Sequence, residues 1–144
     1  MGISEKSSKL TDTLATLIEN QLTLAGEDEL ARQNKYDLNE DDLSNLKDPY
    51  VYGYIYGFID YAHQIVGTDE EHWIASNIMI FDRIYGHSGS QILGEINFLM
   101  HNDPQCQKGI SAGSEDYGNF FFDRQNKKPE PRNPFSLFDY LISK

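Results

Sequence analysis

Two Asp-x-x-His pairs have a spacing that suits metal chemistry: Asp60 with His63, and Asp69 with His72. Dinuclear metal proteins built from helices use a carboxylate-x-x-His spacing of this kind. Their metal-binding side chains point into the bundle core and meet carboxylates from other helices. We therefore ask which face of its helix each histidine occupies.

The helix that carries His72 is expected to bury an apolar stripe and to leave its opposite face in water. The stripe is Ile74, Ile78, Phe81 and Tyr85, widened by Trp73, Ile80 and Ile84. On a helical wheel His72 falls with Ser76 and Arg83, opposite this stripe. The pairs therefore indicate solvated histidines near helix ends, and we expect no metal site.

Residues 37–48, DLNEDDLSNLKD, match part of a calcium-binding loop. Acidic or amide side chains hold the first three ligand positions, and Asp48 falls on the twelfth. However, Asp42 stands where the sharp turn of such a loop needs glycine, and the twelfth ligand is normally glutamate. Asp48 is also needed to cap a helix that starts at Pro49. We interpret the segment as an acidic connector exposed to solvent.

Cys106 and the segment GHSGS at 86–90 are the candidates for nucleophilic chemistry. A helix start lowers the pKa of a thiol, and Cys106 lies in the first turn of a predicted helix. Its place in an apolar stripe instead indicates an inert core cysteine. The run at 86–90 is typical of a turn, and GISAGS at 109–114 lies within a helical pattern, where small residues favour close packing. We expect no catalytic residue and no cofactor.

The net charge of the chain limits the classes of partner that we expect it to bind. It has 144 residues, which suits one domain, and a net charge of −11 from 12 basic and 23 acidic residues. A negative field repels phosphate backbones and anionic membrane surfaces, so we expect neither nucleic acid nor membrane as a partner. The same field attracts basic proteins. The alternative to a basic partner is that the acidic residues only keep the protein soluble.

The single cysteine and the N-terminus bear on the compartment. Cys106 has no second cysteine with which to form an intrachain disulfide, as is usual in a reducing compartment. The first ten residues contain no apolar run of the kind that a secretory signal needs. No stretch approaches the roughly 18 apolar residues of a membrane span. We therefore expect a cytoplasmic protein.

Apolar residues recur at helical spacing along most of the chain, which predicts an all-α fold of about five or six helices. Asp48-Pro49 and Asp103-Pro104 are typical helix starts, and Thr68 with Glu71 has the pattern of a capping box. The expected segments are 5–25, 49–66, 69–85, a helix around 92–100, a helix that begins at 104, and a last one from 134.

Charge and proline content divide the chain into three parts. Residues 1–123 are expected to form a single compact helical domain, which is acidic, and residues 124–133 a Pro-rich basic linker. Residues 134–144 are expected to form a C-terminal amphipathic helix.

The segment DPYVYGYIYGFIDYAHQ at 48–64 contains a face that we call the tyrosine–glycine face. It consists of Tyr50, Gly53, Tyr54, Gly57 and Tyr61. One interpretation is a helix packed on both sides within its own domain, where glycines permit close approach of another backbone. The other is a docking groove for a second chain, since tyrosine suits interfaces. The C-terminal helix is a candidate to fill it, from the same chain or from a partner.

These features favour a non-catalytic cytosolic protein that binds another protein. An immunity or inhibitor protein that neutralises a basic partner is the model, by analogy of charge and size. The predicted contacts are the tyrosine–glycine face and four acids of the connector, Asp37, Glu40, Asp41 and Asp42. One alternative is a homodimeric structural or regulatory module. Another is an enzyme or metal-binding helical protein whose site a single sequence does not reveal.

Overall fold

The computed structural model describes residues 2–24, 46–125 and 135–143, and every regular element in these ranges is helical. This confirms the predicted all-α fold. The elements are α1 (Gly2–Leu24), α3 (Pro49–Val66), α4 (Glu70–Tyr85), the short 3₁₀ turn η1 (Gly86–Ser88), α5 (Gly89–Asn102), α6 (Pro104–Gln125) and α7 (Ser136–Ile142).

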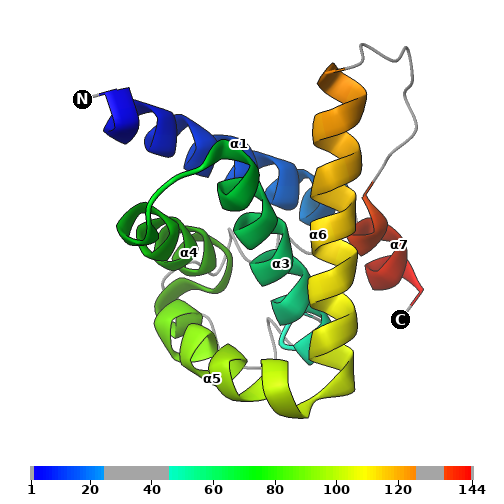
Figure 1. Cartoon of the computed structure of the whole chain (residues 1–144). Coiled ribbons are helices and arrows are strands. Elements are labelled where there is room, and N and C mark those ends of the chain that lie inside the picture. Colours follow the sequence, from blue (N-terminus) through cyan, green and yellow to red (C-terminus); the bar gives the residue numbers. More distant parts are fainter. Residues whose placement is uncertain (1, 25–45, 126–134, 144) are drawn as a thin grey trace.

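Helices α3 and α6 form the centre of the molecule and run parallel, side by side (Figure 1). Helices α4 and α5 connect them in sequence and lie on one side of the pair, whereas α7 lies on the other. Helix α1 crosses one end of the molecule and packs mainly on α4. This arrangement leaves α4 and α5 with an outer surface that α7 does not cover.

Aromatic side chains fill much of the core. Tyr54, Phe58, Phe81 and Tyr85 are all fully buried. The Tyr54 and Phe58 rings stack with centroids 5.8 Å apart, and those of Phe81 and Tyr85 with centroids 5.9 Å apart. Aromatic pairs of this kind contribute about 0.5–1.5 kcal/mol beyond the apolar area that they bury. Phe81 and Tyr85 are therefore core residues, as predicted.

Local capping chemistry sets the ends of the central helices. Asp48 caps α3, and its Oδ1 accepts the Tyr50 backbone N–H at 2.8 Å. Gly67 ends α3 with a φ of 81°, a left-handed conformation that glycine adopts without steric cost. Asp103 repeats the arrangement before α6, where its Oδ1 accepts the Gln105 N–H at 2.8 Å. Both predicted Asp-Pro starts are confirmed.

The predicted capping box at the start of α4 is wrong. The cap is Asp69, whose Oδ1 accepts the backbone N–H of His72 at 3.0 Å. The Thr68 hydroxyl instead contacts Nδ1 of His63. An aspartate three residues before the free N–H competes for the cap as well as threonine does, so the sequence pattern alone did not separate the two.

The predicted apolar stripe of α4 is partly wrong. Ile74 and Ile78 remain 43% and 40% exposed, whereas Ser76, Ile80 and Ile84 are buried. The buried face is therefore rotated away from the first two isoleucines. It includes polar side chains that the apolar pattern assigned to water.

Helix α1 accounts for this rotation. Thr11 Oγ1 donates to Ser76 Oγ at 3.1 Å, and Arg83 Nη2 donates to Glu19 Oε1 at 2.6 Å. Ser76 and Arg83 of the face that also carries His72 thus contact α1 through polar side chains. Our expectation that this face points to water is wrong for Ser76, which is buried, whereas Arg83 is exposed and the His72 side chain is partly exposed. The polar pairs with α1 carry no hydrophobic periodicity.

The acids predicted as a contact surface, Asp37, Glu40, Asp41 and Asp42, lie outside the described residues. The predicted linker at 124–133 also falls mostly outside them. Helix α6 continues to Gln125, two residues beyond the predicted boundary at 123, and α7 begins at Ser136. The three-part division of the chain stays a prediction.

Candidate functional site

Helix α6 of the same chain covers the tyrosine–glycine face. A Cβ atom placed on Gly53 would clash with the Cys106 carbonyl, and one on Gly57 would clash with the backbone of Ile110. Gly109 and Gly113 of α6 meet the α3 backbone equally closely, at the Tyr50 and Tyr54 carbonyls. Glycines from both helices therefore let the two backbones approach.

The structure thus brings the predicted tyrosine–glycine residues together in the interior of one chain. Gly53, Tyr54 and Gly57 are buried, and Tyr50 and Tyr61 are half-buried. This agrees with the interpretation of a helix packed on both sides. A docking groove or a homodimer on this face requires α6 to leave it.

A buried carboxylate links the tyrosine–glycine face to α7. Asp116 of α6 is 7% exposed, and its Oδ2 accepts the Tyr54 hydroxyl at 2.7 Å. Burial, followed by the charge of Asp116, raises the pKa of Tyr54 far above its usual value. Gln21 Nε2 donates to the same hydroxyl at 3.2 Å, so α1 joins the network.

The same carboxylate holds the start of α7. The Ser136 backbone N–H donates to Asp116 Oδ2 at 2.6 Å, and the Ser136 hydroxyl donates to it at 2.8 Å. Near the end of α7, the Tyr140 hydroxyl donates to Asp48 Oδ2 at 2.6 Å, and its ring stacks on Tyr50 with centroids 4.1 Å apart. The C-terminal helix therefore docks on its own chain.

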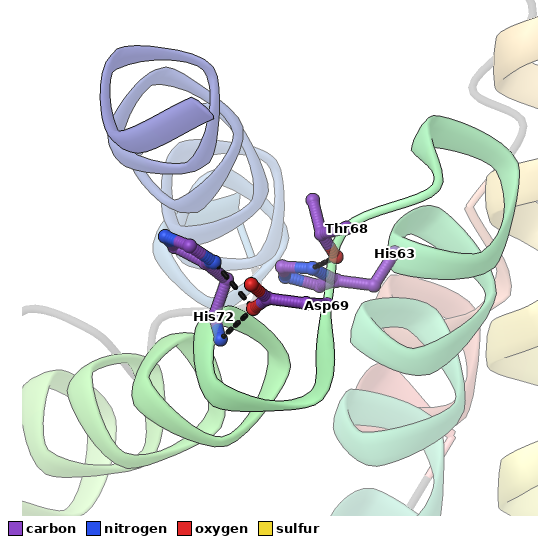
Figure 2. Close-up of polar contacts among 4 residues, drawn as sticks. All are labelled: His63, Thr68, Asp69 and His72. Atoms are coloured by element: carbon purple, nitrogen blue, oxygen red, sulfur yellow. Dashed lines mark hydrogen bonds and ion pairs between the residues drawn. The ribbon is translucent and has the colours of Figure 1, made fainter. Parts of the chain in front are cut away.

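Figure 2 shows His63, Thr68, Asp69 and His72 around the turn between α3 and α4. His63 is 3% exposed, so the prediction of a solvated histidine is wrong for this residue. Its Nδ1 contacts the Thr68 hydroxyl, and its Nε2 has no hydrogen-bond partner among the described residues. His72 Nδ1 lies 2.5 Å from Asp69 Oδ1. Asp60 Oδ2 accepts from Gln64 Nε2 at 2.8 Å. Within ranges 2–24, 46–125 and 135–143, no three His, Cys, Asp or Glu side chains gather as metal ligands.

Burial governs the chemistry of His63 and Cys106. It lowers the pKa of His63, which favours the neutral imidazole, although the charge of Asp60 acts in the opposite direction. Burial, followed by the charge of Asp103, raises the pKa of the Cys106 thiol. A thiol with a raised pKa is a poor nucleophile, in agreement with a core cysteine.

A groove lies between α4 and α5, and its volume is about 390 Å³. We call it the α4–α5 groove. Its lining is Tyr56 from α3, Trp73, Ile74, Asn77 and Ile78 from α4, and Ser90, Leu93, Gly94 and Asn97 from α5. None of these residues was among the predicted contacts. The sequence did not reveal the groove, because the apolar periodicity of this helix predicted that Ile74 and Ile78 are buried in the core.

Three features shape the α4–α5 groove. The Tyr56 and Trp73 rings meet edge to face, with centroids 5.9 Å apart and planes at 80°. Ile74 and Ile78 of α4 line it while partly exposed to solvent. On the α5 side stands Gly94, where an added Cβ would meet no atom within 4 Å. The groove is therefore apolar, and the space next to Gly94 is open.

Two polar atoms beside the groove lack hydrogen bonds within the described residues. They are the indole Nε1 of Trp73 and Oδ1 of Asn77, both shielded from solvent. The Asn77 side chain is fixed by its Nδ2, which donates to the Trp73 carbonyl at 2.9 Å. An unpaired buried polar group costs about 1–3 kcal/mol, so each such atom calls for an explanation.

Acidic side chains border the groove on α4. Glu71 precedes Ile74 by three residues, and Asp82 follows Ile78 by four, so the four side chains lie along one helix face. Both acids are exposed. The one Lys or Arg of α4, Arg83, pairs with Glu19 on α1. On α5, the exposed Glu95 follows Gly94 directly.

Comparison of the chain with protein-family models, curated proteins and solved structures finds no match. A separate search of the helices in the described ranges finds none long and apolar enough to cross a membrane.

Proposed function

We propose that the chain is a non-catalytic cytosolic protein that binds a basic protein partner through an acidic surface. One observation carries the proposal: on the outer face of α4, the exposed pair Ile74 and Ile78 is bounded by Glu71 and Asp82. Apolar side chains exposed beside an apolar groove are typical of a surface that a partner covers. Acids at both ends of the pair favour a partner with positive charge.

The charge of the whole chain supports the same partner. A net charge of −11 steers cationic proteins toward the surface and repels anionic ones. Immunity and inhibitor proteins that neutralise a basic toxin or nuclease are one class with such properties. This chain resembles that class of proteins in charge and size, and the proposed binding surface is located from the side chains of α4.

The test is affinity capture of partners from the native cell, followed by measurement of the association rate with each purified partner. We expect proteins of net positive charge, bound at low salt and associating more slowly as salt rises. Exposed charges are screened beyond about 8 Å at physiological ionic strength. The variant Glu71→Gln with Asp82→Asn should reduce both the association rate and its salt dependence.

A second double variant, Asp41→Asn with Asp42→Asn, tests the acidic connector by the same measurement. The Glu71→Gln with Asp82→Asn variant should lower the melting temperature only slightly, because both carboxylates are exposed, although Glu71 lies in the first turn of α4. The Asp41→Asn with Asp42→Asn variant should leave it nearly unchanged. A partner that is neutral or acidic, or whose association rate ignores salt and both double variants, contradicts the proposal.

A further inference from the structure

Gly94 is a helix-interior glycine that nothing in the described chain accounts for. Glycine within a helix lowers stability by about 1 kcal/mol relative to alanine, so we expect a compensating contact where one occurs. Gly53 and Gly57 of α3 have one, because each meets the α6 backbone. Gly94 lies in α5, at the surface of the groove, and an added Cβ would enter open space. A comparable contact at Gly94 requires an atom supplied from outside the described residues.

Asn77 gives a second, independent indication of an occupant. Its side chain lines the groove and is 4% exposed, yet its Oδ1 has no hydrogen-bond partner in the described ranges. The neighbouring Trp73 Nε1 is likewise unpaired. Both atoms are shielded from solvent, so an occupant that brings a donor and an acceptor pairs with them only if the side chains that shield them move.

The charge around the groove selects the occupant. Between residues 70 and 102, α4, η1 and α5 carry the acids Glu70, Glu71, Asp82 and Glu95 and a single Lys or Arg, Arg83. Because Arg83 pairs with Glu19 of α1, this surface is negative. Phe98 is 66% exposed one turn beyond Gly94, so apolar surface continues along α5 past the groove. An occupant that matches both properties is apolar on one side and basic on the other.

We propose that the α4–α5 groove binds a basic amphipathic helix of a partner protein. The apolar side of that helix packs on Ile78 and Leu93 and crosses close to the Gly94 backbone, and its Lys or Arg side chains reach Glu71 and Asp82. Recognition of an amphipathic helix in an apolar groove is a recurring mode of protein binding. This inference rests on the proposed function and names its partner element.

The test uses the fluorescence of Trp73, the only tryptophan of the chain, which lies in the groove wall. The probe is a Leu/Lys peptide of about 16 residues, long enough to form an amphipathic helix on binding. Two reference peptides accompany it: a scrambled one of the same composition, and an amphipathic one with Glu in place of Lys. We expect the basic amphipathic peptide to shift the Trp73 emission and to bind at least about tenfold more tightly than either reference.

Two variants of the protein complete the experiment. Gly94→Leu places a side chain in the groove and should weaken binding of the basic amphipathic peptide by about tenfold or more. Ser111→Leu adds the same side chain at an exposed position of α6 and should leave binding unchanged. Circular dichroism and melting curves should show that both variants fold as the wild type does.

The outcomes separate the inference from the proposed function. Equal binding of the scrambled and amphipathic basic peptides, or unchanged binding by Gly94→Leu, overturns the helix-in-groove inference. Either result leaves the recruitment of basic partners by charge intact. Absence of binding by every basic peptide, at low salt as well, also overturns the inference. The proposed function fails separately if captured partners are not basic.

Discussion

The carboxylate of Asp116 on α6 accepts the backbone N–H of Ser136 at 2.6 Å, and so caps α7 from another helix. The residue at the N-cap of α7 itself, Phe135, makes no side-chain hydrogen bond that caps the helix. The same Asp116 oxygen accepts the buried Tyr54 hydroxyl at 2.7 Å. One side chain therefore joins the central pair of helices to the C-terminal helix.

Asp116→Ala should destabilise the protein by about 2–4 kcal/mol, because it removes the cap and leaves a buried tyrosine hydroxyl with fewer partners. Chemical denaturation followed by circular dichroism measures this. The control is Glu115→Ala, its exposed neighbour on α6, which should change the free energy of unfolding by less than about 0.5 kcal/mol. Equal effects of the two substitutions would show that α7 is not held by this carboxylate.

A pair of glycine substitutions tests the close approach of α3 and α6. Gly57→Leu should destabilise the fold by about 1–3 kcal/mol or more, because a side chain there meets the Ile110 backbone, which has no room to shift. Gly94→Leu should leave the free energy of unfolding unchanged or raise it by up to about 1 kcal/mol, since leucine favours helix and has open space. Thermal melts of both variants check the contrast. If Gly57→Leu is as stable as Gly94→Leu, the two helices are not in backbone contact.

Much of this fold was predictable because its boundaries are set by local chemistry. Asp48-Pro49, Gly67 and Asp103-Pro104 start or end helices through caps that involve only neighbouring residues. The small residues at 109–114 indicated close packing, and the structure places Gly109 and Gly113 against α3. These features need no knowledge of the tertiary fold.

The candidate site was not predictable in this way. Which face of α4 is buried depends on α1, whose Thr11 hydroxyl donates to Ser76 across the interface. That choice leaves Ile74 and Ile78 at the surface, against the apolar period. Gly94 also carries no local signal that separates it from Gly57, because only the tertiary fold shows which glycine meets a backbone.

Protonation of His63 should destabilise the fold at mildly acidic pH. Burial lowers the pKa of His63 in the folded state below its ordinary value near 6.5, so the unfolded chain takes up the proton more readily. The stability that neutral His63 contributes is therefore complete above about pH 6.5 and is lost as pH falls from there toward the lower folded pKa.

Melting temperatures between pH 8 and pH 5 measure this effect against a variant. Over this range His63→Gln should lose less stability than the wild type does, because it has no imidazole at this position to protonate. His101→Gln, at an exposed position of α5, should follow the wild type. A wild-type pH profile that matches His63→Gln would mean that the buried imidazole does not contribute.

Asn77 should limit the stability of the protein, because beside the α4–α5 groove it buries an oxygen that has no hydrogen-bond partner among the described residues. Asn77→Leu removes that oxygen and fills a similar volume with apolar atoms, so it should leave the free energy of unfolding unchanged or raise it by about 1 kcal/mol. Its neighbour Ser76 provides the contrast, since Ser76→Ala removes the acceptor of the Thr11 hydrogen bond and should lower stability by about 1 kcal/mol. Denaturation curves of both variants measure the two changes in the free energy of unfolding. A loss of stability in Asn77→Leu comparable to that of Ser76→Ala would mean that the Asn77 bond to the Trp73 carbonyl outweighs its unpaired oxygen, and that the amide is kept for folding rather than for an occupant of the groove.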